Sequence, residues 1–248
     1  MSRSLAYGLH PVRSLLEREP AGIARLLLLD PNRPPFAELA TLAAAHGITV
    51  ERRPAGTLDR LCGGAVHQGA LALLSAPPQA LDENALEAIL ASAAQPLLLV
   101  LDEVQDPRNL GACLRSADAA GVDAVIVPRR NAAGLTPVAC RTAVGAAESL
   151  AYYEVGNLAN LLDQLRERGV WVVGTALEER SESLFAFQAP DALAVVMGAE
   201  GAGLKRLTRD KCDQLLEIPM AGEVQSLNVS VATGVMLFHV RAQRESSE

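Results

Sequence analysis

The sequence Leu97-Leu98-Leu99-Val100-Leu101 is a run of five apolar residues, and it predicts a strand that is buried on both faces. Further strand-sized apolar runs follow it, at residues 124–127, 170–175, 193–197 and 215–218. Helix-length segments alternate with these runs, at residues 110–120, 158–168, 204–211 and 229–243. This alternation predicts an α/β fold in which helices cover both faces of a mostly parallel sheet.

The part of the chain before this run has the pattern of a smaller domain. Short apolar runs occupy residues 26–29, 48–50 and 70–74, and the apolar residues of segment 36–46 fall on one face of a helix. We therefore expect a small α/β/α domain over residues 1–75. Pro77 and Pro78 disfavour both helix and sheet, so residues 76–95 are predicted to form a linker and a connecting helix. The second domain is expected to span residues 96–248.

Composition limits the classes of function. The chain has 248 residues, half of them hydrophobic, and its formal net charge is −7. This balance argues against binding to nucleic acid through bulk positive charge. Residues 1–80 carry a small positive charge whereas the rest of the chain is acidic, so we expect any RNA to bind mainly to the first domain.

Cysteine usage and hydropathy indicate the cellular environment. The cysteines stand far apart without any CxxC pair, at Cys62, Cys113, Cys140 and Cys212. This spacing favours neither a zinc site nor a disulfide framework, so we expect no metal and a reducing, cytoplasmic location. No apolar run approaches the roughly 18 residues of a membrane helix, so no membrane contact is expected.

Three segments of the second domain break ordinary helix and strand rules, and each follows a predicted strand: residues 102–117, 197–204 and 218–234. Ligands bind at the carboxyl ends of strands in open α/β sheets, so one site is expected to contain all three. In the first segment, Asn109 is either a helix N-cap or a site residue. Arg115 is either a site residue or the partner of Asp118 in a solvated ion pair.

The second segment places three glycines in six residues, at Gly198, Gly201 and Gly203. Their order matches neither the dinucleotide-binding motif nor a P-loop, so neither an NAD site nor an NTPase is supported. The segment is either a tight strand-to-helix turn or a ligand cradle. Glu200 would repel a phosphate, so it suits a neutral or cationic ligand, or a structural hydrogen bond.

The third segment contains two residues that favour helix N-caps, Ser226 and Asn228. The helix that follows them is rich in small residues, which allow another backbone to pack closely. It is either a core helix, a helix at a subunit interface, or a helix threaded beneath neighbouring loops.

Together these segments resemble a known family. Pro107 with NLGACLRSA (109–117), GAEGAGL (198–204) and IPMAGEVQSLNVSVATG (218–234) resemble the three ordered motifs of the SpoU, or TrmH, family of RNA ribose 2′-O-methyltransferases in the SPOUT superfamily. The resemblance covers residues 96–244. In addition, YGLHPV (7–12) and HQG (67–69) resemble the substrate-binding domain of ribosomal-protein-L30e type that precedes the catalytic domain in several members.

The resemblance implies a fold and a methyl donor. The catalytic domain is expected to contain a SPOUT-type parallel sheet with a deep trefoil knot and to bind S-adenosylmethionine without a metal. The residues implied in donor binding are Thr175, Ala176, Gly198, Ile218, Met220, Gly222 and Leu227. Family members are homodimers with active sites at the subunit interface.

The resemblance also implies a reaction. With the extra first domain, the chain is most similar to members that methylate a guanosine ribose in 23S rRNA or its large-subunit precursor. Arg115 is expected to stabilise the developing alkoxide, since an arginine stays protonated, or to accept the proton only with help from a substrate phosphate. The other catalytic residues implied are Asn109, Glu200, Ser226 and Asn228.

Other interpretations stay open at this point. A tRNA-modifying member of the same family is disfavoured by the additional first domain, and an inactive RNA-binding relative by the intact motif residues. Glu223 and Gln225 depart from the small residues of many relatives, which leaves substrate choice open. His67 either contacts RNA bases or makes a structural hydrogen bond at the start of a strand.

Overall fold

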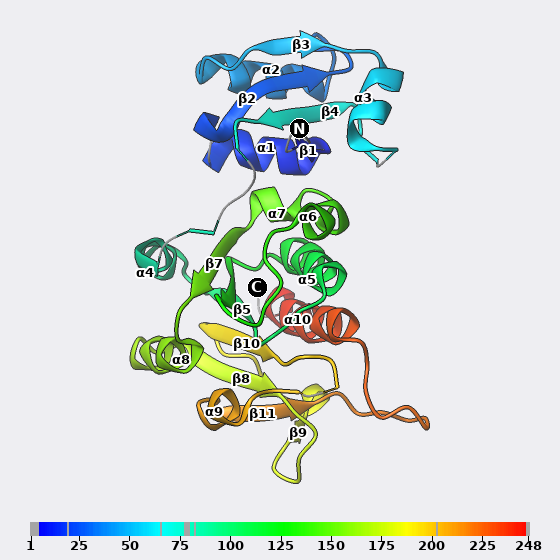
Figure 1. Cartoon of the computed structure of the whole chain (residues 1–248). Helices are drawn as coiled ribbons and strands as arrows, with labels where there is room; N and C mark the ends of the chain where they lie inside the picture. Colours follow the sequence, from blue (N-terminus) through cyan, green and yellow to red (C-terminus); the bar gives the residue numbers. More distant parts are fainter. Residues whose placement is uncertain are drawn as a thin grey trace. The chain divides into compact units, whose positions relative to one another are not determined.

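The computed structural model of the protein describes residues 5–18, 20–64, 66–76, 80–81, 83–201 and 203–246 (Figure 1). The chain divides into two compact units. Unit 1 comprises Met1–Gln79 and Val144–Ser149, and unit 2 comprises Ala80–Ala143 and Leu150–Glu248. Pro77 and Pro78 of the predicted linker lie outside the described residues. The predicted connecting helix is present as α4 (Glu83–Ser92).

Unit 1 is a four-stranded sheet with helices on both faces. Its strands lie in the order β1-β4-β2-β3, where β1 is Leu5–Tyr7, β2 is Ile23–Leu28, β3 is Val50–Arg52 and β4 is Ala70–Leu74. Its helices are α1 (Leu9–Arg18), α2 (Phe36–Ala45), α3 (Ala55–Cys62) and the short α7 (Ala146–Ser149). Side chains alternate along β2: Leu26 and Leu28 join the core cluster of α1 and α2, whereas Leu27 packs with Leu58 of α3. The predicted α/β/α arrangement is confirmed.

Unit 2 contains a seven-stranded sheet in the order β7-β6-β5-β10-β8-β11-β9, and all neighbouring strands in it are parallel. The strands are β5 (Leu97–Leu101), β6 (Ala124–Pro128), β7 (Ala151–Val155), β8 (Trp171–Thr175), β9 (Glu182–Ser183), β10 (Leu193–Met197) and β11 (Gln214–Glu217). The helices besides α4 are α5 (Pro107–Ala120), α6 (Pro137–Ala143), α8 (Leu158–Glu167), α9 (Arg206–Asp210) and α10 (Val229–Glu245). The predicted parallel α/β sheet is therefore confirmed.

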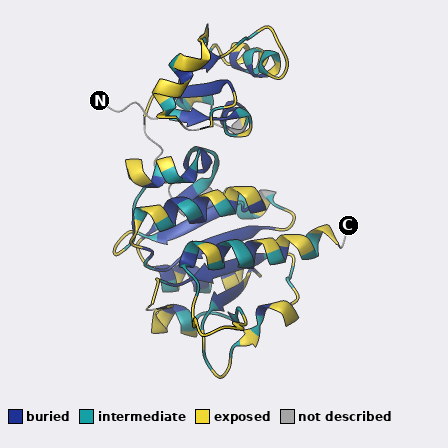
Figure 2. Cartoon of the chain, turned by 90° about the vertical axis from the view of Figure 1, so that its right-hand side faces the viewer, coloured by how far each residue is buried: buried dark blue, intermediate teal, exposed yellow. Residues whose placement is uncertain are grey.

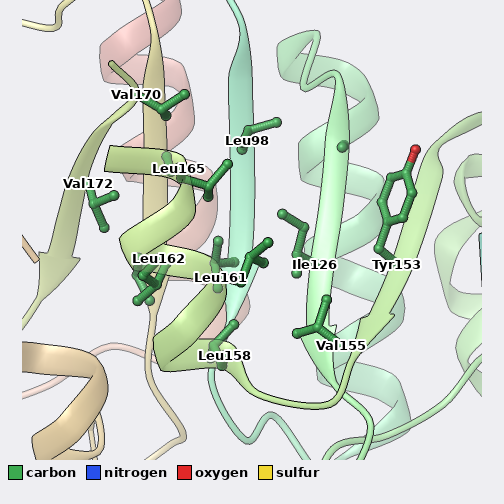
Figure 3. Close-up of a cluster of buried hydrophobic side chains, with 14 of the residues drawn as sticks. Leu98, Ile126, Tyr153, Val155, Leu158, Leu161, Leu162, Leu165, Val170 and Val172 are labelled. Carbon is green, nitrogen blue, oxygen red and sulfur yellow. The ribbon is translucent and has the colours of Figure 1, made fainter. Parts of the chain in front are cut away.

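Helices bury both faces of this sheet. On one face, α8 packs Leu158, Leu161 and Leu165 into a cluster with Leu98 and Ile126 of the strands (Figure 3). On the other face α5 and α10 lie side by side, and the buried Cys113 Sγ is 3.5 Å from Thr233 Oγ1. The strands are buried while the outer surfaces of these helices are exposed (Figure 2). Burial on both faces explains the unbroken apolar runs of β5 and β10.

The strand order places a ligand site. Of the strands β5, β8 and β10, β10 comes last in the sequence, yet it pairs with both of the others. The direction of chain progression therefore reverses beside β5, and open α/β sheets bind ligands at the carboxyl ends of strands at such a point. The segments that follow β5, β10 and β11 start at this edge. The trefoil knot implied by the resemblance stays a prediction.

Hydropathy gives one further finding. None of the helices in the described ranges is long and apolar enough to cross a membrane.

Candidate active site

A cavity of about 340 Å³ opens at the carboxyl ends of β8, β10 and β11. Its volume falls in the range of small-molecule pockets. Most of the residues expected to bind the methyl donor line it: Thr175, Ala176, Gly198, Ile218, Met220 and Leu227. The remaining one, Gly222, is exposed and does not line the cavity.

The glycine segment after β10 forms one wall of the cavity. A Cβ atom on the buried Gly198 would lie 2.2 Å from the carbonyl carbon of Gly203, so only glycine fits there. Gly201 and Gly203 have φ values of 79° and 67°, which favour glycine. Ala199 and Gly203 exchange two backbone hydrogen bonds of 3.1 and 2.9 Å. The segment is thus a tight turn, as one interpretation predicted, and it also faces the cavity.

Three chain-distant polar side chains meet beside this wall. Asn109 Nδ2 donates to Glu200 Oε2 at 3.0 Å, and Asn228 Nδ2 donates to the same oxygen at 3.3 Å. Asn228 Nδ2 also lies 3.0 Å from Asn109 Oδ1, which accepts from it. Glu200 lines the cavity, so the two amides hold a carboxylate at its edge. The structure therefore brings together Asn109, Glu200 and Asn228, three of the five expected catalytic residues.

Helix capping explains how two of these residues are placed. Asn228 is the N-cap of α10, as predicted: its Oδ1 accepts from the backbone N–H of Ser230 at 2.9 Å. For Asn109, the N-cap interpretation is wrong. Asp106 caps α5, accepting from Arg108 N at 2.7 Å, and Pro107 occupies the first turn. The amide of Asn109 is therefore available to bind Glu200.

The other two expected catalytic residues lie apart from this network. Ser226 is exposed and lines the cavity. Arg115 is exposed on α5, and the described residues show no salt bridge between it and Asp118, the alternative partner that the sequence offered. Its guanidinium is free to meet a substrate.

The charge of the cavity indicates its ligand. Among the described lining residues, the ionisable side chains are three carboxylates, Glu178, Glu200 and Glu217, and one cation, Arg209. A wall with an excess of carboxylates fits a ligand with cationic groups better than it fits a phosphate. A sulfonium such as S-adenosylmethionine meets this requirement. Within the described ranges, no group of three or more His, Cys, Asp or Glu side chains is placed to hold a metal ion.

His67 of unit 1 has both ring nitrogens engaged. Nδ1 accepts from the backbone N–H of Gly69 at 2.9 Å, and Nε2 lies 3.0 Å from Asp59 Oδ1. These contacts make Nε2 the protonated nitrogen. The predicted structural role at the start of β4 is thus confirmed.

The sequence interpretation missed the ionisable cavity residues Glu178, Arg209 and Glu217. Glu178 stands three residues beyond the end of β8, so its position after a predicted strand was a usable signal. Arg209 carried no such signal, because it reaches the cavity only through the packing of α9 in the tertiary structure.

Comparison with protein families gives two matches. The model of the SpoU rRNA Methylase family matches residues 96–238. The model described as RNA 2′-O ribose methyltransferase substrate binding matches residues 5–80.

Full-length relatives agree with these matches. The chain is 48% identical over 249 residues to the 23S rRNA (guanosine-2′-O-)-methyltransferase RlmB of Vibrio cholerae, with 98% of each chain covered. It is 46% identical over 241 residues to the protein of the same name from Escherichia coli K12, covering 97% of this chain and 98% of that protein.

Solved structures share the fold. The AdoMet-bound rRNA methyltransferase from Sinorhizobium meliloti matches with a TM-score of 0.68 and 25% identity, covering 97% of this chain and 87% of that one. The SpoU methyltransferase AviRb from Streptomyces viridochromogenes, in complex with AdoMet, matches with a TM-score of 0.69 and 25% identity, covering 99% and 92%. From these matches and from the cavity at the sheet edge, the chain belongs to the SpoU rRNA methylase family.

Proposed function

We propose that this protein transfers the methyl group of S-adenosylmethionine to the ribose 2′-hydroxyl of a guanosine in 23S rRNA. The observation that carries the proposal is the network of Asn109, Glu200 and Asn228 at the edge of a cavity with mostly acidic side chains. Relatives that share almost the full length of the chain are named for this reaction. The substrate would place the protein in the cytoplasm.

Glu200 and Arg115 have different roles in the proposed reaction. The donor, when bound, supplies a methyl group that is already strongly electrophilic, whereas a ribose hydroxyl is a weak nucleophile. The protein must therefore align the hydroxyl with the methyl group and stabilise charge on the oxygen. Glu200, fixed by the two amides, is placed to orient the sulfonium of the donor. Arg115, which stays protonated, stabilises the developing alkoxide from the exposed side of α5.

Unit 1 is proposed to bind the RNA. Two partly buried carboxylates, Asp30 and Glu51, are paired with four more exposed arginines, Arg25, Arg33, Arg52 and Arg53. The excess of guanidinium groups over carboxylates leaves donors for RNA phosphates. We call these four residues the unit 1 arginine patch.

The protein is further proposed to act as a homodimer. Val231 and Phe238 stand seven residues apart on the same face of α10, and the two residues are 52% and 49% exposed. An exposed apolar stripe on a helix is typical of a surface that a partner covers. A second copy of the chain on α10 agrees with the interface helix that the family resemblance implies.

A tRNA substrate is the alternative within the family. The TrmH/SpoU tRNA modifying enzyme of A. aeolicus covers 66% of this chain, with a TM-score of 0.57 and 28% identity. The substrate-binding match at residues 5–80 lies in the additional first part of the chain, which favours rRNA.

The experiment that tests this choice is a map of ribose methylation in rRNA and tRNA from cells with and without the gene. We expect one guanosine of 23S rRNA to lose its methyl group in the deletion strain. Loss confined to tRNA, or no loss, would contradict the proposal.

A further inference from the structure

The methyl donor carries a negative charge that the network of Asn109, Glu200 and Asn228 does not bind. S-adenosylmethionine combines a cationic sulfonium and a cationic ammonium with one α-carboxylate. The lining carboxylates Glu200 and Glu217 suit the cations, but they would repel the carboxylate. Among the described residues that line the cavity, Arg209 alone has a positive side chain. The carboxylate therefore has a single cationic candidate as its partner.

We propose that Arg209 binds the α-carboxylate of S-adenosylmethionine and that Glu178 holds the guanidinium in place. This inference rests on the proposed function, because it takes the methyl donor as the ligand of the cavity. It assigns the amino-acid end of the donor to the side of the cavity formed by α9 and by the loop after β8.

The contacts of Arg209 leave donors available for a ligand. Its Nη1 binds Glu178 Oε1, and within the described part of the chain no hydrogen bond uses its Nε or Nη2. An arginine has five N–H donors in a planar fork that matches a carboxylate. The side chain is 31% exposed, so its free edge remains accessible.

Glu178 is itself fixed at its other oxygen. Arg180 Nε donates to Glu178 Oε2 at 3.2 Å, and the backbone N–H of Glu178 donates to Ser181 Oγ at 3.2 Å. The net charge of this group of side chains is that of a single positive charge, since it contains Arg180, Arg209 and one carboxylate, Glu178. An anion is therefore attracted to this side of the cavity even though Arg209 already has an acidic partner. Glu178 acts as a positioning residue that presets the direction of the Arg209 fork.

Calorimetry with two donor analogues tests the inference. S-adenosylhomocysteine has the carboxylate but no transferable methyl group, and its decarboxylated analogue, S-adenosyl-3-thiopropylamine, differs from it only in lacking the carboxylate. The wild-type protein is expected to bind S-adenosylhomocysteine about 10- to 100-fold more tightly than the analogue, the range of a hydrogen bond to a charged group. In Arg209→Gln, the affinity for S-adenosylhomocysteine is expected to fall to the affinity that the wild-type protein has for the decarboxylated analogue. The affinity for the analogue should stay the same, so the ratio of the two affinities falls close to one.

Variants at other positions separate recognition from structure. Arg206→Gln makes the same charge change on the same helix at a residue that is 83% exposed on its side chain and does not line the cavity, so it should keep the wild-type ratio. Glu178→Gln should reduce the ratio, because the guanidinium of Arg209 loses the carboxylate that sets its direction. Arg209→Lys, which keeps the charge but loses the fork, should retain part of the ratio.

Each result decides a different claim. If the wild-type protein binds both ligands equally, or if Arg209→Gln weakens both by the same factor, the assignment of Arg209 is wrong while the proposed function stands. If the wild-type protein binds neither ligand, the proposed function itself fails. Should Arg209→Gln not fold, the wild-type ratio and the Arg209→Lys ratio still decide the question.

Discussion

At the scale of single residues, the site depends on a carboxylate held by two amides. Glu200 Oε2 accepts from both Asn109 and Asn228, which stand 91 and 28 residues away in the sequence. Each hydrogen bond to a charged group contributes about 1.5–3 kcal/mol when it is well formed. The carboxylate is thus oriented before any ligand arrives, and pre-organisation of this kind lowers the cost of reaching the transition state.

Arg115 should act in the reaction but not in donor binding. Arg115→Ala is expected to lower kcat by at least about 100-fold, because a charge that stabilises the developing alkoxide is lost. The affinity for S-adenosylhomocysteine should change little, since Arg115 does not line the cavity. Methyl transfer to 23S rRNA and calorimetry measure the two quantities. An equal loss of both would exclude a role specific to the reaction.

Glu148 of α7 predicts a pH dependence of stability. Its Oε2 is buried and has no hydrogen-bond partner among the residues that the structure describes, and burial raises the pKa of the carboxyl to about 7 from 4.5. A folded-state pKa above the unfolded value means that the contribution of the group is fully present below pH 4.5 and is lost as the pH rises through about 7. At pH 8 the folded protein must therefore keep a poorly solvated carboxylate.

Glu148→Gln removes this carboxylate. The variant should gain up to about 3 kcal/mol of unfolding free energy relative to the wild type at pH 8, at roughly 1.4 kcal/mol per pKa unit, and much less at pH 5. Urea unfolding at the two pH values measures the difference. Glu167 is exposed, so Glu167→Gln serves as the control. Its effect on the unfolding free energy should be the same at the two pH values. A gain of equal size at both pH values would argue against ionisation as the cause.

At the scale of elements, the glycine turn after β10 joins the fold to the site. Gly198→Ala would drive a Cβ to within 2.2–2.4 Å of the backbone of Gly203 and Leu204, so the turn must open. We expect a loss of donor binding of at least about tenfold and a lower Tm, because backbone cannot yield as a side chain can.

Gly222→Ala is the matched control for this change. A Cβ at Gly222 meets no atom of the described residues within 4 Å, and Gly222 does not line the cavity. Donor affinity and Tm should therefore stay at wild-type values. If Gly222→Ala weakens donor binding as strongly as Gly198→Ala does, the donor extends over the loop before α10, as the family resemblance implies for Gly222.

The elements also show what could be predicted from the sequence. The strands β5 and β10 were predicted residue for residue, since burial on both faces leaves an unbroken apolar run. β7 was missed because Ala151–Val155 contains two tyrosines and a glutamate instead of such a run. Also missed were the short strands β1 and β9 and the helices α1, α3, α6 and α7. The strand expected at residues 48–50 lies at Val50–Arg52, so its boundary was wrong by two residues.

The site was predictable to a similar degree. The motifs placed Asn109, Glu200 and Asn228 in segments that follow predicted strands, and the parallel sheet brings the starts of those segments to one edge. Pro107 at the start of α5 already pointed to Asp106 as the N-cap, since proline favours the first helical position. The pairing of Arg209 with Glu178 joins α9 to the loop after β8, and no local pattern encodes such a tertiary contact.

At the scale of the whole molecule, the two units are not two continuous halves of the chain. Val144–Ser149 groups with unit 1 although it lies between elements of unit 2. Sequence patterns follow the chain, so the predicted boundary at residue 75 had no means of including this segment. If unit 1 binds RNA, it should do so without affecting the methyl donor in the cavity of unit 2.

The unit 1 arginine patch makes that separation measurable. The double variant Arg33→Gln and Arg52→Gln removes its two most exposed members, with side chains 81% and 71% exposed. Binding to a 23S rRNA fragment should weaken, and the slope of log affinity against log salt should fall by about 0.7–0.9 for each RNA phosphate that the variant no longer neutralises. Filter binding at several salt concentrations gives the slope.

The control is Arg13→Gln, at an arginine of α1 that pairs with Glu38 outside the patch. It should change neither the slope nor the affinity for S-adenosylhomocysteine. An unchanged slope in the double variant would remove the patch from the RNA-binding surface.

Methyl transfer by this protein should go to a ribose oxygen of 23S rRNA. The purified protein should be incubated with methyl-labelled S-adenosylmethionine and with 23S rRNA or tRNA transcripts, and the product hydrolysed with alkali. A methylated 2′-oxygen blocks cleavage at that nucleotide, so the label is expected in an alkali-resistant dinucleotide containing guanosine, from 23S rRNA alone. Label released in mononucleotides, which marks methylation of a base, or label found only in tRNA would contradict the account.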